Sequence, residues 1–389
     1  MQFAKRLDRL PPYLFVDINR RIADLRAQGI DIVTFAIGDP DMPTPGHIIE
    51  RICREAHVPA NHRYPETDGL PELHEAIADW YAARFDVDLD PDTEVLPLIG
   101  SKEGIGHIAL CFVESGSVVL VPDPGYPVYS MSTMIAGGNP YYMPLTADNQ
   151  FIPDLDAIPS TVASKATMMW LNYPNNPTGA GTTLEFFERA VDFAAKHNIV
   201  VCHDAPYTEV YFDGKRPPSL MQAKGARDVG VEFHSLSKTY HMTGWRIGMV
   251  VGNKDVLRAL FTVKSNLDSG IPQAIQLAAV EALRGPQTIV EEHNRVLQRR
   301  RDKLIAVLNQ IGLEARVPDG TFYVWARVPE GYTCVSLTRE LLDKVHVAVT
   351  PGIGYGAEGE NFIRFSITLP DDRLEEGVQR LARWGGGAA

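Results

Sequence analysis

Hydrophobic residues along this chain alternate between two periods, one typical of helices and one typical of strands. From about residue 72 onward, helical stretches such as ELHEAIADWYAARF and FFERAVDFAAKHN alternate with short β-rich runs, namely SVVLVP, ATMMWLNYP, IVVCHDAP and IGMVVG. This alternation predicts a largely parallel sheet covered by helices on both faces. Before it, an amphipathic helix that packs on a neighbouring domain is predicted by regularly spaced apolar residues and a glycine stop: Phe15, Ile18, Ile22, Leu25 and Gly29.

A second pattern begins after about residue 285. A long polar helical stretch, EEHNRVLQRRRDKLIAVLNQIG, precedes an α+β region that contains TFYVWARV and ENFIRFSITL. We therefore predict a large α/β domain over residues 41–285 and a smaller α+β domain made of residues 1–40 and 286–389. No internal repeat or low-complexity linker is visible between them.

Composition narrows the possible partners. The 389 residues are 45% hydrophobic and 22% charged, which is typical of a globular protein, and the net charge of −12 argues against nucleic acid or an anionic membrane as the main partner. The cysteines form no CxxC pair, so we expect reduced core thiols and no metal site. The first residues lack the apolar core of a signal peptide, and no run of 18 apolar residues occurs. We expect a cytoplasmic protein without a membrane segment.

Polar residues follow the predicted strands, where ligands gather in open α/β sheets. GSKEG, with Ser101, opens a helix and forms either a phosphate site or an ordinary turn. Tyr126 in PDPGYP is either a stacking platform or a turn aromatic, and Asn176 lies in an Asn-Pro turn that is structural in most proteins. Asp204 and Tyr207, in HDAPY, pair an acid with a phenol, although an acid at a strand end is commonly a helix cap.

The segment HSLSKTYHMTGWRIG sets one amine, Lys238, among hydroxyl groups such as that of Ser235, with a single guanidinium, Arg246, after them. A surface helix would instead spread several charges along one face. Together with the groups at the strand ends, this set meets the needs of pyridoxal 5′-phosphate. The lysine forms a Schiff base, a carboxylate keeps the pyridine nitrogen protonated, and arginine and hydroxyl groups bind the phosphate.

These segments appear in the order found in one known family. FHSLSKTYHMTGWRIG, NYPNNPTG, DAPY, GSKEGI, PDPGYP and PGIGYGAEGENFIRFS resemble the motifs of class I/II aminotransferases of pyridoxal-phosphate fold type I. The resemblance covers almost the whole chain. It implies an aspartate aminotransferase-like α/β fold, with a mostly parallel sheet in the large domain and a smaller α+β domain. It also implies transfer of an amino group between an amino acid and a 2-oxo acid.

The resemblance assigns roles to individual residues. It implies three catalytic residues. Lys238 would bind the cofactor and move a proton, Asp204 would pair with the pyridinium, and Tyr207 would contact the ring hydroxyl. The substrate contacts are Arg364 on the α-carboxylate, Gly38 in a flexible segment, and Asn176. The cofactor-binding residues, besides Lys238, Asp204 and Tyr207, are Ser101, Lys102, Tyr126, Asn176, Ser235, Arg246 and Tyr64, the last reaching across a homodimer interface to the partner's phosphate.

Within the family, RLDRLPPYLFVDINRR, SKTYHMTGWRIG and KSNLDSGIPQAIQLAA look most like the LL-diaminopimelate aminotransferases. This likeness implies LL-2,6-diaminopimelate and 2-oxoglutarate as the preferred pair, in lysine biosynthesis. FTVK offers Lys264 where one aspartate-active subgroup has an arginine. The distal end of the substrate is then expected to meet neutral groups: Asn266, Ser269, Tyr13 or Phe15.

Other functions stay open at this point. The amino donor is alternatively alanine or aspartate, or the enzyme has a broad range. A pyridoxal-phosphate-dependent C–S lyase would keep the same cofactor residues. A cofactor-binding regulator would need a DNA-binding extension, and a nicotinamide oxidoreductase would need a complete dinucleotide-binding fingerprint, which the chain lacks. His203 is predicted to point away from Asp204, and His241 receives no role.

Overall fold

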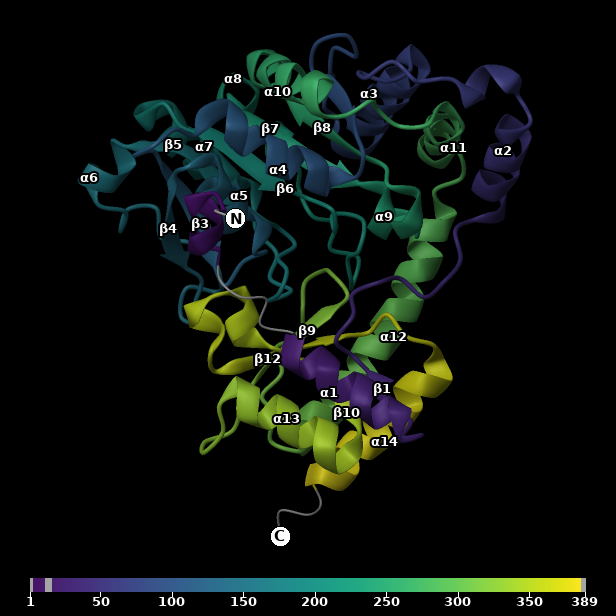
Figure 1. Cartoon of the computed structure of the whole chain (residues 1–389), viewed down its shortest axis with the longest axis vertical. Helices are drawn as coiled ribbons and strands as arrows, with labels where there is room; N and C mark the ends of the chain where they lie inside the picture. The colour runs from purple at the N-terminus through teal and green to yellow at the C-terminus, as the bar shows by residue number, and fades with distance from the viewer. Residues whose placement is uncertain (1–2, 11–15, 386–389) are drawn as a thin grey trace.

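The computed structural model describes residues 3–10 and 16–385 of the chain. Figure 1 shows a larger part, drawn in blue and teal, above a smaller part drawn in purple and yellow. The helix α12 (Thr288–Gln310) runs from the larger part into the smaller one. Residues of both parts line one cavity.

A seven-stranded sheet forms the centre of the larger part, in the order β2-β8-β7-β6-β5-β3-β4. Strand β8 is antiparallel to both of its neighbours, and the other pairs are parallel, as the sequence predicts for a mostly parallel sheet. In chain order, the strands are β2 (Val95–Leu98), β3 (Val118–Asp123), β4 (Asn139–Pro144), β5 (Ala166–Leu171), β6 (Val200–Asp204), β7 (Gly230–Ser235) and β8 (Gly248–Gly252).

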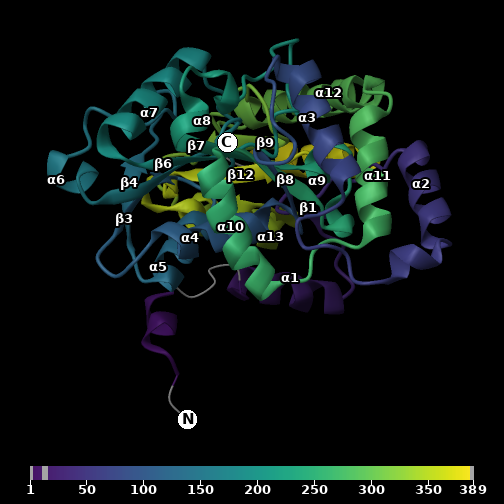
Figure 2. The ribbon, with the colours of Figure 1, turned by 90° about the horizontal axis from the view of Figure 1, so that it is seen from above.

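Both faces of this sheet are buried, because alternate residues of each central strand enter different cores. In β5, Met168 and Trp170 pack with α4, α5 and α10, whereas Met169 and Leu171 pack with α3, α7 and α11. Figure 2 shows these two groups of helices on opposite sides of the sheet. The helices of this part are α2 (Gly46–Ala56), η2 (Pro59–His62), α3 (Pro71–Phe85), α4 (Ser101–Phe112), α5 (Val128–Ala136), α6 (Ser160–Ala163), α7 (Leu184–His197), η3 (Leu220–Gln222), α8 (Ala226–Val229), α9 (Leu236–Thr239), η4 (Thr243–Trp245), α10 (Lys254–Leu267) and α11 (Gln273–Arg284).

The smaller part contains a three-stranded antiparallel sheet, β11-β12-β9, and a short parallel pair, β1 with β10. One apolar core joins these strands to α12, α13 and α14. Its elements are α1 (Val16–Ala27), β1 (Val33–Thr34), β9 (Tyr323–Arg327), α13 (Cys334–Val345), β10 (Val347–Ala348), β11 (Thr350–Pro351), η5 (Gly352–Tyr355), η6 (Ala357–Gly359), β12 (Phe362–Ser366) and α14 (Asp371–Gly385). The helix η1 (Lys5–Arg9) precedes them and contacts α5 in the larger part.

An ion pair ties the segment between the two parts to α12. Arg300 donates from Nη1 and Nη2 to the two carboxylate oxygens of Asp41, at 2.7 and 3.0 Å, and from Nε to Asp371 at 2.6 Å. Asp41 is the first residue of the predicted large domain, so the fork fixes the chain at the predicted junction. The α/β fold class is confirmed, whereas the boundaries at residues 41 and 285 stay a prediction.

Two expectations drawn from composition have different outcomes. All four cysteines are free thiols; Cys202 and Cys334 are buried, but Cys53 is exposed, so the prediction that every thiol lies in the core is wrong. The exposed side of α2, on which Cys53 lies, has no described partner that would bury it. Among the described helices, none is long and apolar enough to span a membrane.

Candidate active site

A cavity of about 660 Å³ lies beyond the carboxyl ends of β5, β6 and β7. It brings together almost all of the site residues predicted from the sequence. Those that line it are Gly38, Ser101, Lys102, Tyr126, Asn176, Asp204, Tyr207, Ser235, Lys238, Arg246 and Arg364. Tyr64 is the exception, because it does not line the cavity and its side chain is 89% exposed.

Lys238 enters the cavity from α9, the short helix that follows β7. Its Nζ donates a hydrogen bond to the carbonyl oxygen of Gly38 at 3.1 Å and lies 5.6 Å from the centre of the Phe322 ring. Burial lowers the pKa of this amine, and the positive charges of Arg246 and Arg364 add to the effect. A lysine held in this way is more easily deprotonated, which suits a nucleophile or a base.

Asp204 is the last residue of β6 and is almost fully buried. Tyr129 donates its hydroxyl hydrogen to Oδ2 of Asp204 at 2.6 Å, while Oδ1 is buried without a hydrogen-bond partner among the described residues. Burial raises the pKa of this carboxyl to about 6, against the opposing effect of the Tyr129 hydrogen bond. Tyr207 follows in the next turn, with its hydroxyl 3.3 Å from that of Tyr323.

Groups that are suited to binding an anion lie at the starts of α4 and α9. The helix α4 begins at Ser101, and Gly100 precedes it with a φ of 70° and no side-chain cap. A Cβ at Gly100 would overlap the guanidinium of Arg246, so glycine lets this side chain approach the helix start. The hydroxyl of Ser235 caps α9 by accepting from the Ser237 amide, and Ser237 Oγ is buried without a described partner. Helix starts, hydroxyls and a guanidinium are suited to a phosphate.

Arg364 reaches the cavity from β12 of the smaller part. Its Nη1 donates to Asn176 Oδ1 at 2.8 Å and its Nη2 to the Ala36 carbonyl at 3.0 Å. The guanidinium carbon lies 3.9 Å from the centre of the Tyr323 ring and 4.9 Å from that of Tyr355. The two rings hold the guanidinium plane, and Nε is buried without a described partner. A carboxylate would find a planar, oriented cation here.

A glycine is needed at position 38 because the side chain of Tyr323 packs closely against it, and not because of its backbone conformation. A Cβ at this position would overlap the hydroxyl of Tyr323. Any side chain would therefore displace Tyr323 from Arg364, and would disturb the carbonyl that accepts the Lys238 hydrogen bond. The segment around Gly38 thus fits between the lysine and the arginine.

The cavity also contains residues that were not predicted from the sequence as ligands. They are Ile18, Asn19 and Ile22 of α1, together with Asn172, Ser237, Tyr323 and Tyr355. The apolar spacing of α1 was recognised in the sequence, but nothing in it indicates which partner the helix covers. Asn172 is the first residue of the NYPNNPTG segment, and its Nδ2 donates to the carbonyl oxygen of Asp204 at 2.6 Å. Its place in that segment was the sequence signal that could have identified it.

Of the four residues expected at the distal end of the substrate, two lie among the described residues. Asn266 and Ser269 do not line it, and Tyr13 and Phe15 lie outside the described residues. Lys264 is fully buried and donates to Glu103 at 3.2 Å and to Asp268 at 2.9 Å. It is therefore a structural cation and is not available to a substrate carboxylate.

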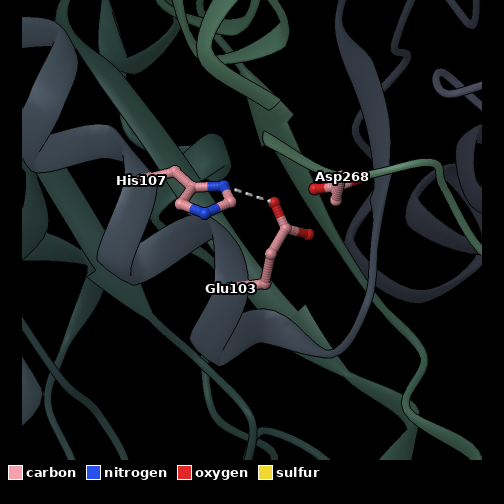
Figure 3. A group of neighbouring side chains, drawn as sticks. All are labelled: Glu103, His107 and Asp268. Carbon is pink, nitrogen blue, oxygen red and sulfur yellow. Dashed lines mark ion pairs between the residues drawn. The ribbon is translucent and has the colours of Figure 1, made fainter. Parts of the chain in front are cut away.

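Figure 3 shows Glu103, His107 and Asp268, of which Glu103 and Asp268 contact this lysine. Oxygen or nitrogen atoms of Glu103, His107 and Asp268 lie within 4.8 Å of one another, a spacing that would suit a metal ion. His107 Nδ1 is 2.9 Å from Glu103 Oε1. The Lys264 ammonium contacts both carboxylates, so the positive charge that this cluster needs is already present in the chain.

Comparison with known proteins adds independent information. Residues 30–381 match the family described as aminotransferase class I and II. The chain is 59% identical to an LL-diaminopimelate aminotransferase of Dehalococcoides mccartyi, over 99% of each chain, and 53% identical to one of Moorella thermoacetica, over 98% of each. Among solved structures, substrate-bound BacF of Bacillus subtilis superposes with a TM-score of 0.94, at 35% identity, covering 99% of this chain and 98% of the other.

Two histidines stack where the larger part meets α12. The rings of His241 and His293 lie 3.9 Å apart and 15° from parallel, and His241 Nδ1 is 3.0 Å from the Met42 carbonyl oxygen. Burial lowers the pKa of His241 to about 4, and His293 contributes. His203 takes no part in this contact, because its Nδ1 lies 2.8 Å from Glu232 in a separate buried pair.

This stack predicts a loss of stability in acid. The unfolded chain protonates His241 near its ordinary pKa of 6.5, whereas the folded chain protonates it only near 4. Between these values the unfolded state binds more protons, so the free energy of unfolding falls as the pH falls. Below 4 both states are protonated and His241 causes no further loss. The folded protein is therefore expected to weaken between pH 6.5 and 4.

The variant His241→Asn tests this prediction. Asparagine tolerates the positive φ of 56° at this position and does not titrate. We expect its acid loss, measured by urea unfolding at a series of pH values, to be smaller than that of the wild type by roughly 1–3 kcal/mol. His197→Asn, at a half-buried position on α7, is the control and should follow the wild-type curve. Parallel curves for wild type and His241→Asn would contradict the prediction.

Proposed function

The chain belongs to the class I and II aminotransferase family, and we propose that it uses pyridoxal 5′-phosphate to move an amino group from LL-2,6-diaminopimelate or glutamate to a 2-oxo acid, in lysine biosynthesis. The observation that carries the proposal is the meeting of Lys238, Asp204 and Arg364 in one cavity. Each supplies a different chemical group that transamination requires.

The residues of the cavity fit this cofactor. Three buried polar atoms that have no described partner lie on its lining residues: Asp204 Oδ1, Ser237 Oγ and Arg364 Nε. Buried polar groups are normally paired, so orphaned atoms at a cavity indicate a missing ligand. The carboxylate suits a protonated pyridine nitrogen, the hydroxyl suits a phosphate, and the guanidinium suits the carboxylate of an amino acid.

Bound pyridoxal phosphate would supply an aldehyde that condenses with amines and a ring that accepts electrons when the α-carbon loses its proton. Lys238 would hold the cofactor through its amine and, once displaced by substrate, would move a proton at the substrate α-carbon. The lowered pKa of this amine favours the neutral form that both tasks need. Asp204 would keep the pyridine nitrogen protonated by pairing with it.

The remaining residues would orient the ring and the substrate. Tyr126 would stack on the ring, and Tyr207 and Asn176 would donate to its oxygen. Ser101, Lys102, Ser235 and Arg246, joined by Ser237, would bind the phosphate and so fix the ring at the end opposite the reacting carbon. Arg364 would bind the α-carboxylate through its planar fork.

Tyr64 leads us to propose a homodimer with shared active sites. In the single chain its side chain is 89% exposed and lies outside the cavity. A large exposed aromatic at a position where the family resemblance implies a cofactor ligand is explained if it reaches the cofactor phosphate of a second copy. A dimer would also bring segments of the partner to the substrate end of each cavity.

The substrate pair rests on whole-chain similarity and on the cations present in the cavity. The relatives at 49–59% identity are named LL-diaminopimelate aminotransferases. The four residues before Ser265, FTVK, contain no arginine, and Lys264 is held by two carboxylates. A second fixed cation for the distal carboxylate of aspartate is therefore not provided by this stretch, which favours a substrate whose distal end carries both charges.

Lys238→Ala is expected to abolish turnover and covalent retention of the cofactor, because the other lysine of the cavity lining, Lys102, belongs to the start of α4, which would bind the phosphate. The measurement is borohydride reduction followed by peptide mass spectrometry. In the wild type the phosphopyridoxyl group should be found on the peptide that contains Lys238, and in the variant on no peptide. Lys196→Ala, at an exposed position on α7, should behave as the wild type. Full turnover of Lys238→Ala would refute the assignment.

Arg364→Lys keeps the charge and removes the planar fork. We expect kcat/KM for amino acids to fall about 10- to 100-fold, the loss of about one charge-assisted hydrogen bond, with little change in cofactor content. The matched control is Arg327→Lys on the neighbouring strand β9, whose side chain is 54% exposed. If Arg364→Lys and the wild type had equal kcat/KM, the carboxylate would bind elsewhere.

A single-turnover screen tests the amino donor. The visible absorbance of the bound cofactor is followed while each amino acid is added in turn, without a 2-oxo acid. We expect fast conversion by glutamate and LL-diaminopimelate and slow conversion by the meso isomer, because a mismatched polar end leaves buried groups unpaired. Faster reaction with alanine or aspartate would replace the proposed substrate. Release of pyruvate and ammonia would instead indicate a lyase.

A further inference from the structure

Tyr129, a residue that does not line the cavity, donates a short hydrogen bond to the carboxylate of Asp204. It lies in the first turn of α5 and is fully buried, and its hydroxyl donates to Asp204 Oδ2 at 2.6 Å. Its ring stacks on Trp170, with centres 4.7 Å apart and planes 13° from parallel. The hydroxyl is thus held in place by the core of the sheet.

We propose that Tyr129 is a positioning residue that holds Asp204 as a carboxylate and leaves Oδ1 free to face the pyridine nitrogen of the cofactor. The inference rests on the proposed function, because it concerns the residue that would pair with that nitrogen. The sequence predicted only residues that would contact the cofactor or the substrate, whereas Tyr129 would act through one of them.

The two oxygens of Asp204 have different surroundings. Oδ2 accepts from Tyr129, whereas Oδ1 is buried and has no described partner. The backbone is fixed as well, because Asn172 Nδ2 donates to the Asp204 carbonyl oxygen at 2.6 Å. With its carbonyl and one carboxylate oxygen held, the side chain has a single free acceptor, and Asp204 lines the cavity.

A hydrogen-bond donor at Asp204 Oδ2 matters because this carboxylate is buried away from solvent. A buried carboxylate without hydrogen bonds takes up a proton, since burial disfavours the charged form. Burial raises the pKa of Asp204 to about 6, and the hydrogen bond from Tyr129 opposes this effect. Without it, the carboxyl would be neutral over more of the physiological range. A neutral acid would meet a neutral pyridine, and the ion pair that keeps the ring protonated would be lost.

Tyr129 can act only as a donor to this carboxylate. Burial raises the pKa of its phenol well above the ordinary value, and the charge of Asp204 adds to the effect, so the hydroxyl keeps its hydrogen. The same turn of chain also carries Tyr126, whose ring contacts that of Tyr129 edge to face with centres 5.7 Å apart. One short segment therefore supports both the expected stacking face and the expected nitrogen partner of the cofactor.

The test compares two probes on the apoenzyme at neutral pH. One is pyridoxal 5′-phosphate, and the other is its carbocyclic analogue, in which a C–H group replaces the pyridine nitrogen. The ratio of their dissociation constants measures the contribution of the nitrogen contact alone. In Tyr129→Phe, which keeps the stacked ring and removes only the hydroxyl, this ratio is expected to fall about tenfold toward one.

The control is Tyr173→Phe, which also removes a buried tyrosine hydroxyl, one that donates to the Phe151 carbonyl at 2.7 Å and does not touch Asp204. Its ratio should stay within about twofold of the wild type. If Tyr129→Phe weakens both probes equally and leaves the ratio intact, its role is merely structural and the inference is overturned. A wild type that binds neither probe, or binds both equally, would instead overturn the proposed pairing of cofactor and Asp204.

Discussion

The alignment of three parallel strands, β5, β6 and β7, is the constraint on which the site depends. Leu171 pairs with His203 and Asp204 with Phe233, so the strands end at nearly the same level. Residues at or just after these strand ends therefore line one cavity. A slip of one residue in β6 would turn Asp204 into the opposite core and bring His203 to its place. The apolar residues that fix this register are therefore as necessary to the chemistry as the polar ones.

Burial then determines what each polar group can do. Lys238 loses some of its affinity for protons because it is desolvated near two guanidinium groups, whereas Asp204 gains affinity because it is desolvated with one donor. Opposite shifts in one cavity bring an amine and an acid closer to neutrality than they would be in water. Lys264 shows the contrasting case, in which a buried ammonium is paired with the carboxylates of Glu103 and Asp268.

Sequence reasoning identified residues of the cavity lining where they lie in contiguous turns. Turns such as NNPTG and DAPY carry both the bend and the ligand, so their residues could be named in advance. It did not find contacts that join distant segments: Tyr129 and Asp204 are 75 residues apart, and Tyr207 and Tyr323 are 116 apart. His241 received no role, and its ring partner, His293, lies on α12, far from it in the sequence. The strand β7 was also not named, since GVEFHS mixes polar residues into a fully buried strand.

The residues proposed to act on the cofactor and the substrate come from both parts of the molecule. Lys238 and Asp204 come from the large sheet, whereas Arg364 comes from β12 of the smaller one. Their relative positions therefore depend on the junction, where Arg300 forms an ion pair with Asp41 and the rings of His241 and His293 stack. Gly38 lies four residues before Met42, between that junction and the cavity, and its carbonyl accepts from Lys238. The same short segment thus connects the junction to the reactive amine, so a shift of the smaller part would move Arg364 and the Lys238 acceptor together.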